Sequence, residues 1–131
     1  MRSAAAALHV RLAACRVFVR DVLEARAFYA RRLQLTVVAE DLDAGYCALD
    51  AGGVTLVIER VPADAPETDQ VLVGRFTGLS FEVTDIAATY REFCAADVEF
   101  AETPARQPWG GITATLFDPA GNVLQLVQYP R

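Results

Sequence analysis

The residues best suited to metal binding or nucleophilic catalysis are few in this chain of 131 residues, and their spacing favours neither chemistry. His9 is the only histidine, and the three cysteines, Cys15, Cys47 and Cys94, stand far apart. No two cysteines have the short spacing of a zinc clip, and their odd number does not indicate a disulfide framework. None has a histidine within local reach to activate it as a nucleophile. We therefore expect buried, reduced thiols.

Two aromatic residues could contact a planar ligand. Trp109 lies in Pro108-Trp109-Gly110-Gly111, directly before a predicted strand, and an indole flanked by glycines suits stacking on a flat molecule. The alternative is that Trp109 closes the open end of a curved sheet. Tyr46, at the start of a predicted strand, would add a hydroxyl group to the same lining.

The elements that must position these residues follow one order twice. The segment 16–21 reads as a strand that ends on an acid, and a helix follows in which Leu23, Ala27, Phe28 and Leu33 have helical spacing. Leu23, Phe28 and Leu33 are predicted to pack this helix against a sheet. Three short strands are then expected over 35–38, 45–49 and 54–58, with a glycine turn between the last two.

After a polar, proline-containing connector over 60–70, the same order returns. A strand over 78–85 again ends on an acid and precedes a helix over 86–96, and further strands are expected near 99–100, 111–117 and 122–127. The halves superpose at an offset of 64 residues, which places Asp21 on Asp85. Each Asp is predicted to cap the helix that follows it. The pattern favours a duplicated α+β module.

Three sequence motifs, in this order, resemble one superfamily. Val19-Arg-Asp21 followed by Phe28-Tyr29 resembles its V-x-D-x₆-F-Y signature, and Phe81-Glu-Val-Thr-Asp85 resembles the matching strand of its second module. Asp118-Pro-Ala-Gly-Asn122 followed by Leu126 resembles its closing signature, D-P-x-G-N-x-x-E-L. Together these motifs, spanning about 12–129, are similar to the glyoxalase/bleomycin-resistance/dioxygenase (vicinal oxygen chelate) superfamily.

The resemblance implies two βαβββ modules that form a curved mixed sheet around a central cleft, commonly in a homodimer. The chain would be a single glyoxalase-like domain, 1–131, with module one at about 9–60, a linker at about 61–75 and module two at about 76–129.

The resemblance also implies where a metal ion would be held, and those positions carry unsuitable residues. They fall on Ala14, Gly78, about Leu56, and Gln125. Divalent ions need several imidazole or carboxylate ligands, which this set does not supply. His9 stands twelve residues before Asp21 where the ligand stands seven before it, and an odd slip along a strand reverses the face. We expect no metal and no cofactor.

Strand alternation then predicts what lines the cleft in place of a metal. Arg16 and Phe18 are in phase with Ala14, and Ser80 and Glu82 with Gly78, so that these four would face the cleft beside Gln125. Arg16 and Glu82 are either a structural ion pair or the polar anchors of a ligand site. The small residues Ala14 and Gly78 would leave room for a ligand group, although Gly78 could equally mark a close backbone approach. In resembling proteins the loop that holds Trp109 borders the cleft.

Composition excludes several classes of function. The net charge is −5 and every basic residue is a scattered Arg, so nucleic acid is not an expected partner. The apolar runs are too short to cross a membrane, Met1–Leu8 reads as a tail or an irregular first strand, and the protein is expected in the cytoplasm. Hydrophobic residues at 53% and charged residues at 22% are typical of a globular protein.

The sequence leaves three functions open. The first is a homodimeric protein that binds a small organic molecule in its cleft without a metal. The second is an enzyme, either a metal-dependent lyase or dioxygenase of the same superfamily or one in which Glu82 performs acid–base chemistry beside Arg16. The third is a structural dimer module without a ligand. The ligand itself is not identified, because one fold supports many functions.

Overall fold

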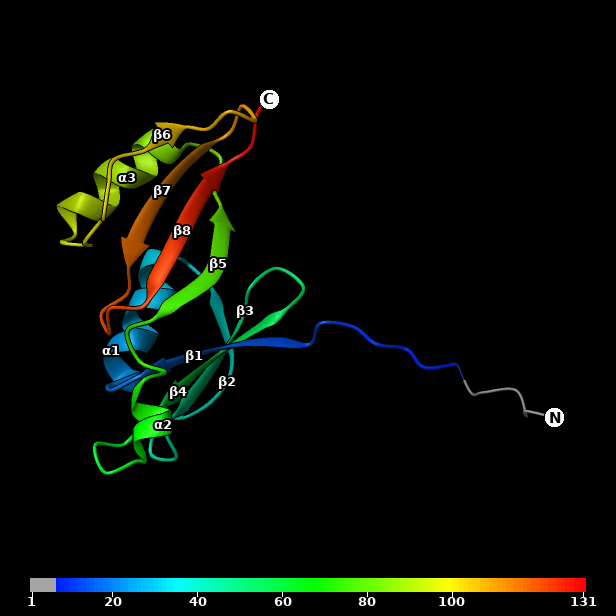
Figure 1. Cartoon of the computed structure of the whole chain (residues 1–131), viewed down its shortest axis with the longest axis vertical. Coiled ribbons are helices and arrows are strands. Elements are labelled where there is room, and N and C mark those ends of the chain that lie inside the picture. Colours follow the sequence, from blue (N-terminus) through cyan, green and yellow to red (C-terminus); the bar gives the residue numbers. More distant parts are fainter. Residues whose placement is uncertain (1–6) are drawn as a thin grey trace.

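The first half of the chain forms a four-stranded sheet with one helical segment on it. The computed structural model describes residues 7–131 (Figure 1). The strands of the first sheet lie in the order β1-β4-β3-β2, and β1 runs parallel to β4. The helical segment is α1 (Val22–Ala27), which continues as the π-helical turn η1 (Phe28–Arg32). The strands are β1 (Ala14–Val19), β2 (Thr36–Asp41), β3 (Tyr46–Asp50) and β4 (Thr55–Arg60).

The second half repeats this arrangement. Its sheet has the order β5-β8-β7-β6, with β5 parallel to β8, and α3 (Ile86–Ala95) packs on it. A short helix, α2 (Glu67–Gln70), lies in the connector between β4 and β5, residues 61–75. The strands are β5 (Phe76–Glu82), β6 (Ala105–Arg106), β7 (Ile112–Phe117) and β8 (Val123–Gln128). The predicted α+β fold of two βαβββ modules is confirmed.

Both helices begin as the sequence indicates. The Asp21 carboxylate accepts a hydrogen bond from the Glu24 amide at 3.1 Å, and the Asp85 carboxylate accepts one from the Ala88 amide at 3.0 Å. The strand expected near 99–100 is reduced to a single bridge between Phe100 and Leu116, and the regular pairing comes later, at β6.

The expected apolar face of the first helix is wrong at Leu23. Its side chain is 62% exposed, whereas Val22, Ala25, Phe28 and Tyr29 are buried. The sheet therefore meets a face rotated by one residue from the one predicted, since Val22 follows the cap directly and takes the inward position. Phe28 is buried and Leu33 half-buried, as expected.

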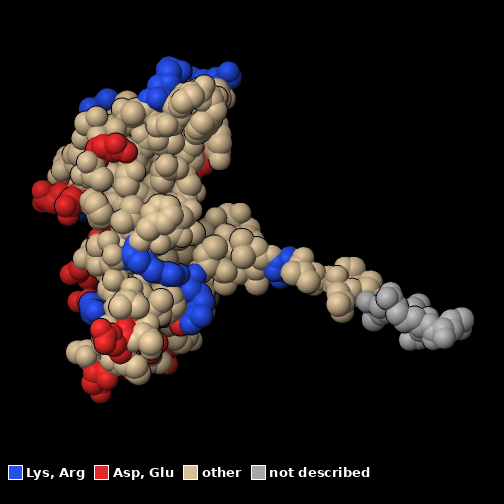
Figure 2. Space-filling model, viewed as in Figure 1, with Lys and Arg blue, Asp and Glu red and all other residues tan. Residues whose placement is uncertain are grey.

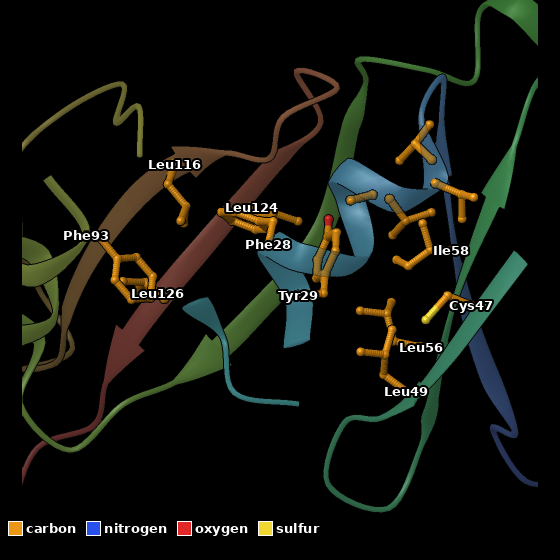
Figure 3. Close-up of a cluster of buried hydrophobic side chains, with 14 of the residues drawn as sticks. Phe28, Tyr29, Cys47, Leu49, Leu56, Ile58, Phe93, Leu116, Leu124 and Leu126 are labelled. Carbon is orange, nitrogen blue, oxygen red and sulfur yellow. The ribbon is translucent and has the colours of Figure 1, made fainter. Parts of the chain in front are cut away.

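The helical segment of module one lies between the two sheets and joins them into one core. Figure 3 shows Tyr29 among Cys47, Leu56 and Ile58 of the first sheet, while Phe28 extends toward Leu124 of the second. The rings of Phe28 and Tyr29 meet edge to face, with centroids 5.0 Å apart. The adjacent rings of Phe28 and Tyr29 thus pack against different sheets.

The closing motif fastens module two to module one. Asn122 is fully buried; its amide nitrogen donates to the Phe18 carbonyl at 2.9 Å, and its oxygen accepts from the Gly74 amide at 2.9 Å. Asp118, 4% exposed, accepts a 2.7 Å hydrogen bond from the Tyr29 hydroxyl. We call Tyr29, Asp118 and Asn122 the clasp.

Residues 7–13 precede β1 as an extended segment that projects away from the body of the protein (Figure 1). The tail expected over Met1–Leu8 lies, for its first six residues, outside the residues described. Across residues 7–131, no helix has the length and apolar character to span a membrane.

Candidate functional site

Each sheet has one face against the core and one open face, and six of the seven predicted site residues lie on the open faces. Along β1, Val17 and Val19 are buried on the core side, whereas Arg16 and Phe18 alternate with them on the other side. Along β5, Ser80 and Glu82 are exposed in the same way. Figure 2 shows acidic side chains mainly along the helix-bearing side of the molecule at left, with the surface over β5 and β8 largely uncharged.

On the first sheet, Arg16 pairs with Glu59 of β4 and not with Glu82. The Arg16 Nε lies 2.5 Å from Glu59 Oε2, and the hydrogen bond with this carboxylate raises the pKa of the guanidinium. The two residues are one strand apart on the same face, whereas Glu82 belongs to the other sheet. Of the two alternatives for Arg16 and Glu82, the ion pair is therefore wrong, and their role as polar anchors of a ligand site stays a prediction.

Phe18 is the aromatic centre of the first open face. The guanidinium carbon of Arg16 lies 5.1 Å from its ring centroid, and that of Arg75 lies 5.6 Å from it. Tyr46 stands opposite Glu59 on β3, so its side chain shares this face and is 39% exposed. Arg75 makes no ion pair within residues 7–131, and its charge remains available beside an aromatic ring.

On the second sheet, Ser80 and Gln125 form a direct polar pair. They stand opposite each other on β5 and β8, and the Ser80 hydroxyl donates to the Gln125 side-chain oxygen at 2.8 Å. Thr115 of β7 stands opposite Gln125 on its other side. The three side chains form a polar row across the open face.

Glu82 lies in a groove that follows the outer edge of β5. The groove has a volume of about 770 Å³ and runs between β5, α3 and the residues that follow η1. Ser80 and Glu82 line it together with Arg32, Gln34 and Tyr129. Of these five polar or aromatic residues, two were predicted and three were not indicated by the sequence.

Trp109 lies at the end of the second sheet, 53% exposed and next to Tyr129, with ring centroids 5.9 Å apart. Its indole folds over Gly111, where a Cβ atom would lie 2.0 Å from the ring. The glycine is thus required for the indole to rest on the backbone. Both interpretations of Trp109 remain predictions, since half of its surface is available to a ligand.

The seven predicted residues form two groups, one on each sheet. Within residues 7–131, no hydrogen bond or ion pair joins the groups. The first group is Arg16, Phe18 and Tyr46, to which the structure adds Glu59 and Arg75; the second is Ser80, Glu82, Gln125 and Trp109, to which it adds Tyr129.

The added residues lacked a usable signal in the sequence. Glu59 could have been found from the parallel pairing of β1 with β4, but that register is a tertiary property. Arg75 lies in the connector, and Tyr129 follows the last strand, where no periodicity specifies a direction.

The residues at the metal positions of the resembling proteins do not fit a metal ion. Leu56 is 1% exposed and points into the core, so that the position estimated for β4 falls on the wrong face; Thr55 and Val57 are its open-face neighbours. Ala14 offers no ligand atom, and the side-chain oxygen of Gln125 already accepts from Ser80. Between residues 7 and 131, no three His, Cys, Asp or Glu side chains are grouped as a metal site requires.

Gly78 has a backbone reason for being glycine. Its φ is +74°, in a stretch of β5 where the pairing with β8 is irregular between Phe76 and Ser80. A side chain would be strained in this left-handed conformation. Gly78 is thus explained by local strand geometry, whether or not a ligand uses the adjacent space.

The cysteines are free, and they differ in exposure. Cys47 is buried, and burial raises the pKa of its thiol, which keeps it protonated. Cys15 is half-buried and Cys94 is exposed, so the expectation of three buried thiols is wrong for Cys94.

The comparisons with known proteins agree with this architecture. The model of the Glyoxalase/Bleomycin resistance protein/Dioxygenase superfamily matches residues 11–126, and the chain therefore belongs to this superfamily. No protein of curated function matches the chain.

Solved structures of the same class share the fold. A superfamily member from Sphaerobacter thermophilus DSM 20745 is 22% identical with a TM-score of 0.75, over 92% of this chain and 98% of that one. The lactoylglutathione lyase of Agrobacterium tumefaciens is 20% identical with a TM-score of 0.70, over 90% and 92%. A glyoxalase/bleomycin resistance protein/dioxygenase from Nocardioides is 18% identical with a TM-score of 0.68, over 96% and 87%. At these identities the likeness establishes the fold alone.

Proposed function

We propose that the protein binds a small, planar organic molecule on the open faces of its sheets, without a metal ion. The observation that carries the proposal is the polar row of Ser80, Gln125 and Thr115 at the place where resembling proteins hold a metal ligand. Neutral hydroxyl and amide groups orient an organic ligand by hydrogen bonds but do not hold a divalent ion.

The first sheet would supply the complementary half of the site. Phe18 offers a ring for stacking, and the Arg75 guanidinium beside it would attract a carboxylate or another anionic group. The Arg16 charge is balanced by Glu59, so that Arg16 positions Phe18 and Glu59 and adds little net attraction for an anion.

The proposed functional unit is a homodimer. The two groups of site residues lie on separate sheets, and the open faces carry exposed apolar side chains, among them Phe76 at 77% and Tyr46 at 39%. A second copy that placed its second sheet against the first sheet of its partner would cover these side chains and bring both groups to one cleft.

We also propose that the protein acts in the cytoplasm. Three free, separated cysteines are typical of a reducing compartment.

Ligand-dependent melting tests the proposal. A panel of aromatic, anionic, cationic and thiol compounds is screened against the protein with and without EDTA, and separately with Ni²⁺, Zn²⁺, Fe²⁺ and Mn²⁺. A ligand present at about 100 times its Kd should add about 2.7 kcal/mol to the free energy of unfolding, a shift of roughly 5 °C or more. The shift should be the same with EDTA, and the ions alone should give none.

Variants then assign the site. Gln125→Ala should weaken binding of a ligand found in the screen about fivefold to tenfold, the effect of one lost hydrogen bond. Gln70→Ala is the matched control, because its amide contacts the connector and Arg20 only. Stoichiometric metal in protein purified without chelator, or a complete lack of ligand shifts, would overturn the proposal.

A further inference from the structure

A second cavity lies on the helix-bearing side of the molecule, away from the open faces. It is a crevice of about 370 Å³ between the first helical segment and the turn that joins β7 to β8, which lie side by side in Figure 1. None of the seven predicted site residues lines this crevice, although Arg32 also lines the groove along β5. Cavities of this size hold small organic molecules.

The crevice brings both signs of charge together without pairing them. Module one contributes Glu24, Arg31 and Arg32, and module two contributes Asp97 and Glu99 from the segment after α3. All five residues are exposed, and within residues 7–131 none of them belongs to an ion pair. Two guanidinium groups and three carboxylates therefore line one small space and remain available to a ligand.

The buried carboxylate of the crevice is not available in this way. Asp118, which is 4% exposed, accepts at Oδ2 from the Tyr29 hydroxyl at 2.7 Å and at Oδ1 from the Asn122 amide at 2.9 Å. The clasp thus forms a fixed wall. Phe28 and Val98 add apolar lining, so the crevice combines a rigid, partly apolar interior with exposed charges.

The end of α3 fixes the position of Asp97. Its φ is +63°, and the Val98 amide donates to the Phe93 carbonyl at 3.0 Å, which closes the helix in the way that a glycine usually does. Glycine would adopt this left-handed conformation without strain, whereas aspartate accepts some strain and brings a carboxylate to the crevice. Asparagine also tolerates this conformation, so Asp97→Asn removes the charge and keeps the backbone.

We propose that the crevice binds a small zwitterion, an α-amino acid with an apolar side chain. The carboxylate of the ligand contacts Arg31 and Arg32, its ammonium group contacts Asp97 and Glu99, and its side chain lies against the apolar lining. A simple anion or cation would be attracted by one set of charges and repelled by the other, whereas a zwitterion is attracted by both. This site is separate from the one proposed on the open faces.

Leucine and two analogues test the proposal. Leucinamide keeps the ammonium group and loses the carboxylate, and 4-methylpentanoate keeps the carboxylate and loses the ammonium group. Leucine also has no planar ring to stack on Phe18. In NMR titrations of isotope-labelled protein, leucine should shift the amides of Arg31, Asp97 and Val98 in a saturable way. Both analogues should bind about tenfold more weakly, the effect of one lost charged contact.

Charge-removing variants assign the two ends of the ligand. Arg31→Gln combined with Arg32→Gln should bind leucine at least about fivefold more weakly and should no longer prefer leucine to leucinamide. Asp97→Asn combined with Glu99→Gln should lose the preference for leucine over 4-methylpentanoate. A general disturbance of the fold would not remove one preference and keep the other.

Three further variants separate the crevice from the rest of the surface. Arg91→Gln and Asp64→Asn are the matched controls, because both residues are exposed and lie outside the crevice, and leucine binding should be unchanged in them. Ala27→Phe places a ring in the crevice without changing a charge and should abolish binding. Because the charges are exposed, leucine should also bind more weakly at high salt.

Equal binding of the three compounds, or unchanged preferences in both charge-removing variants, would overturn the proposal. The absence of saturable shifts at the crevice would overturn it as well, and that result would leave ligand binding on the open faces untouched. Leucine-induced shifts confined to Ser80 and Gln125 would count against the crevice, since those residues lie on an open face.

Discussion

At the scale of single residues, Asp118 and Asn122 of the closing family motif stabilise the fold and do not line the site proposed on the open faces. Asp118 and Asn122 lie away from the open faces; they hold the connector, the Phe18 carbonyl and the Tyr29 hydroxyl in the core. Asp118 also accepts from the Ala120 and Asn122 amides, both at 2.9 Å. Substitutions in the clasp should therefore alter stability, and substitutions at Ser80 or Gln125 should alter binding.

Asn122→Ala should lower the free energy of unfolding by about 3 kcal/mol. The change removes a fully buried side chain and leaves the part-buried Gly74 amide and Phe18 carbonyl without their partner, and polar groups that lose their partners away from water are costly. Urea denaturation measures the loss. Gln107→Ala, which removes amide hydrogen bonds within the β6–β7 hairpin, is the control and should cost less than about 1 kcal/mol. Equal losses of stability in the two variants would contradict the stabilising role of the clasp.

Tyr29 should make the protein sensitive to alkali. Burial, together with the Asp118 carboxylate, raises the pKa of its hydroxyl above the ordinary value of 10.0. Above pH 10 the unfolded chain releases this proton and the folded chain keeps it, so stability should fall as the pH rises, by up to about 1.4 kcal/mol per pH unit.

Below pH 10 the same group contributes no pH dependence, because both states hold the proton. Urea denaturation of the unaltered protein and of Tyr29→Phe between pH 8 and 11 isolates the effect. The slope above pH 10 should be shallower in Tyr29→Phe, which retains Tyr46, Tyr90 and Tyr129. Parallel curves would show that Tyr29 titrates alike in both states.

At the scale of elements, local chemistry predicted where the helices begin but not which face they bury. Asp21 and Asp85 act within three residues, so their role as caps can be read from the sequence. From the sequence, Leu23 and Phe28 fit an apolar helix face equally well. Only the position of the sheet determines that Leu23 faces solvent. The pairing of Arg16 with Glu59 depends on strand register in the same way.

Two substitutions on the first helical segment test this face. Phe28→Ala should cost about 3 kcal/mol, because the ring is 7% exposed and contacts Tyr29. Leu23→Gln should change the free energy of unfolding by less than about 0.5 kcal/mol, since its side chain is 62% exposed. Chemical denaturation of both variants provides the measurement, and a large loss in Leu23→Gln would indicate that the face is partnered in solution.

At the scale of the whole molecule, the two modules should unfold as one unit. Each module has a sheet with only one covered face. The modules share a core because Phe28 and Tyr29 pack against different sheets, and the clasp joins the connector to β1. The chain carries a natural reporter in each half. Trp109 reports on module two through its fluorescence, and Cys47, buried in module one, reports through its reactivity with a thiol reagent.

In urea, the change in Trp109 fluorescence and the exposure of Cys47 should share one midpoint, measured in a Cys15→Ser, Cys94→Ser background that leaves Cys47 as the only thiol. In Asn122→Ala the two midpoints should separate, because the modules lose the contacts that couple them before they lose their own sheets. Separate midpoints in the unaltered chain would mean that the shared core is too weak to couple the modules. In that case the site residues on each sheet would be held by their own module alone, and a second copy would have to align them.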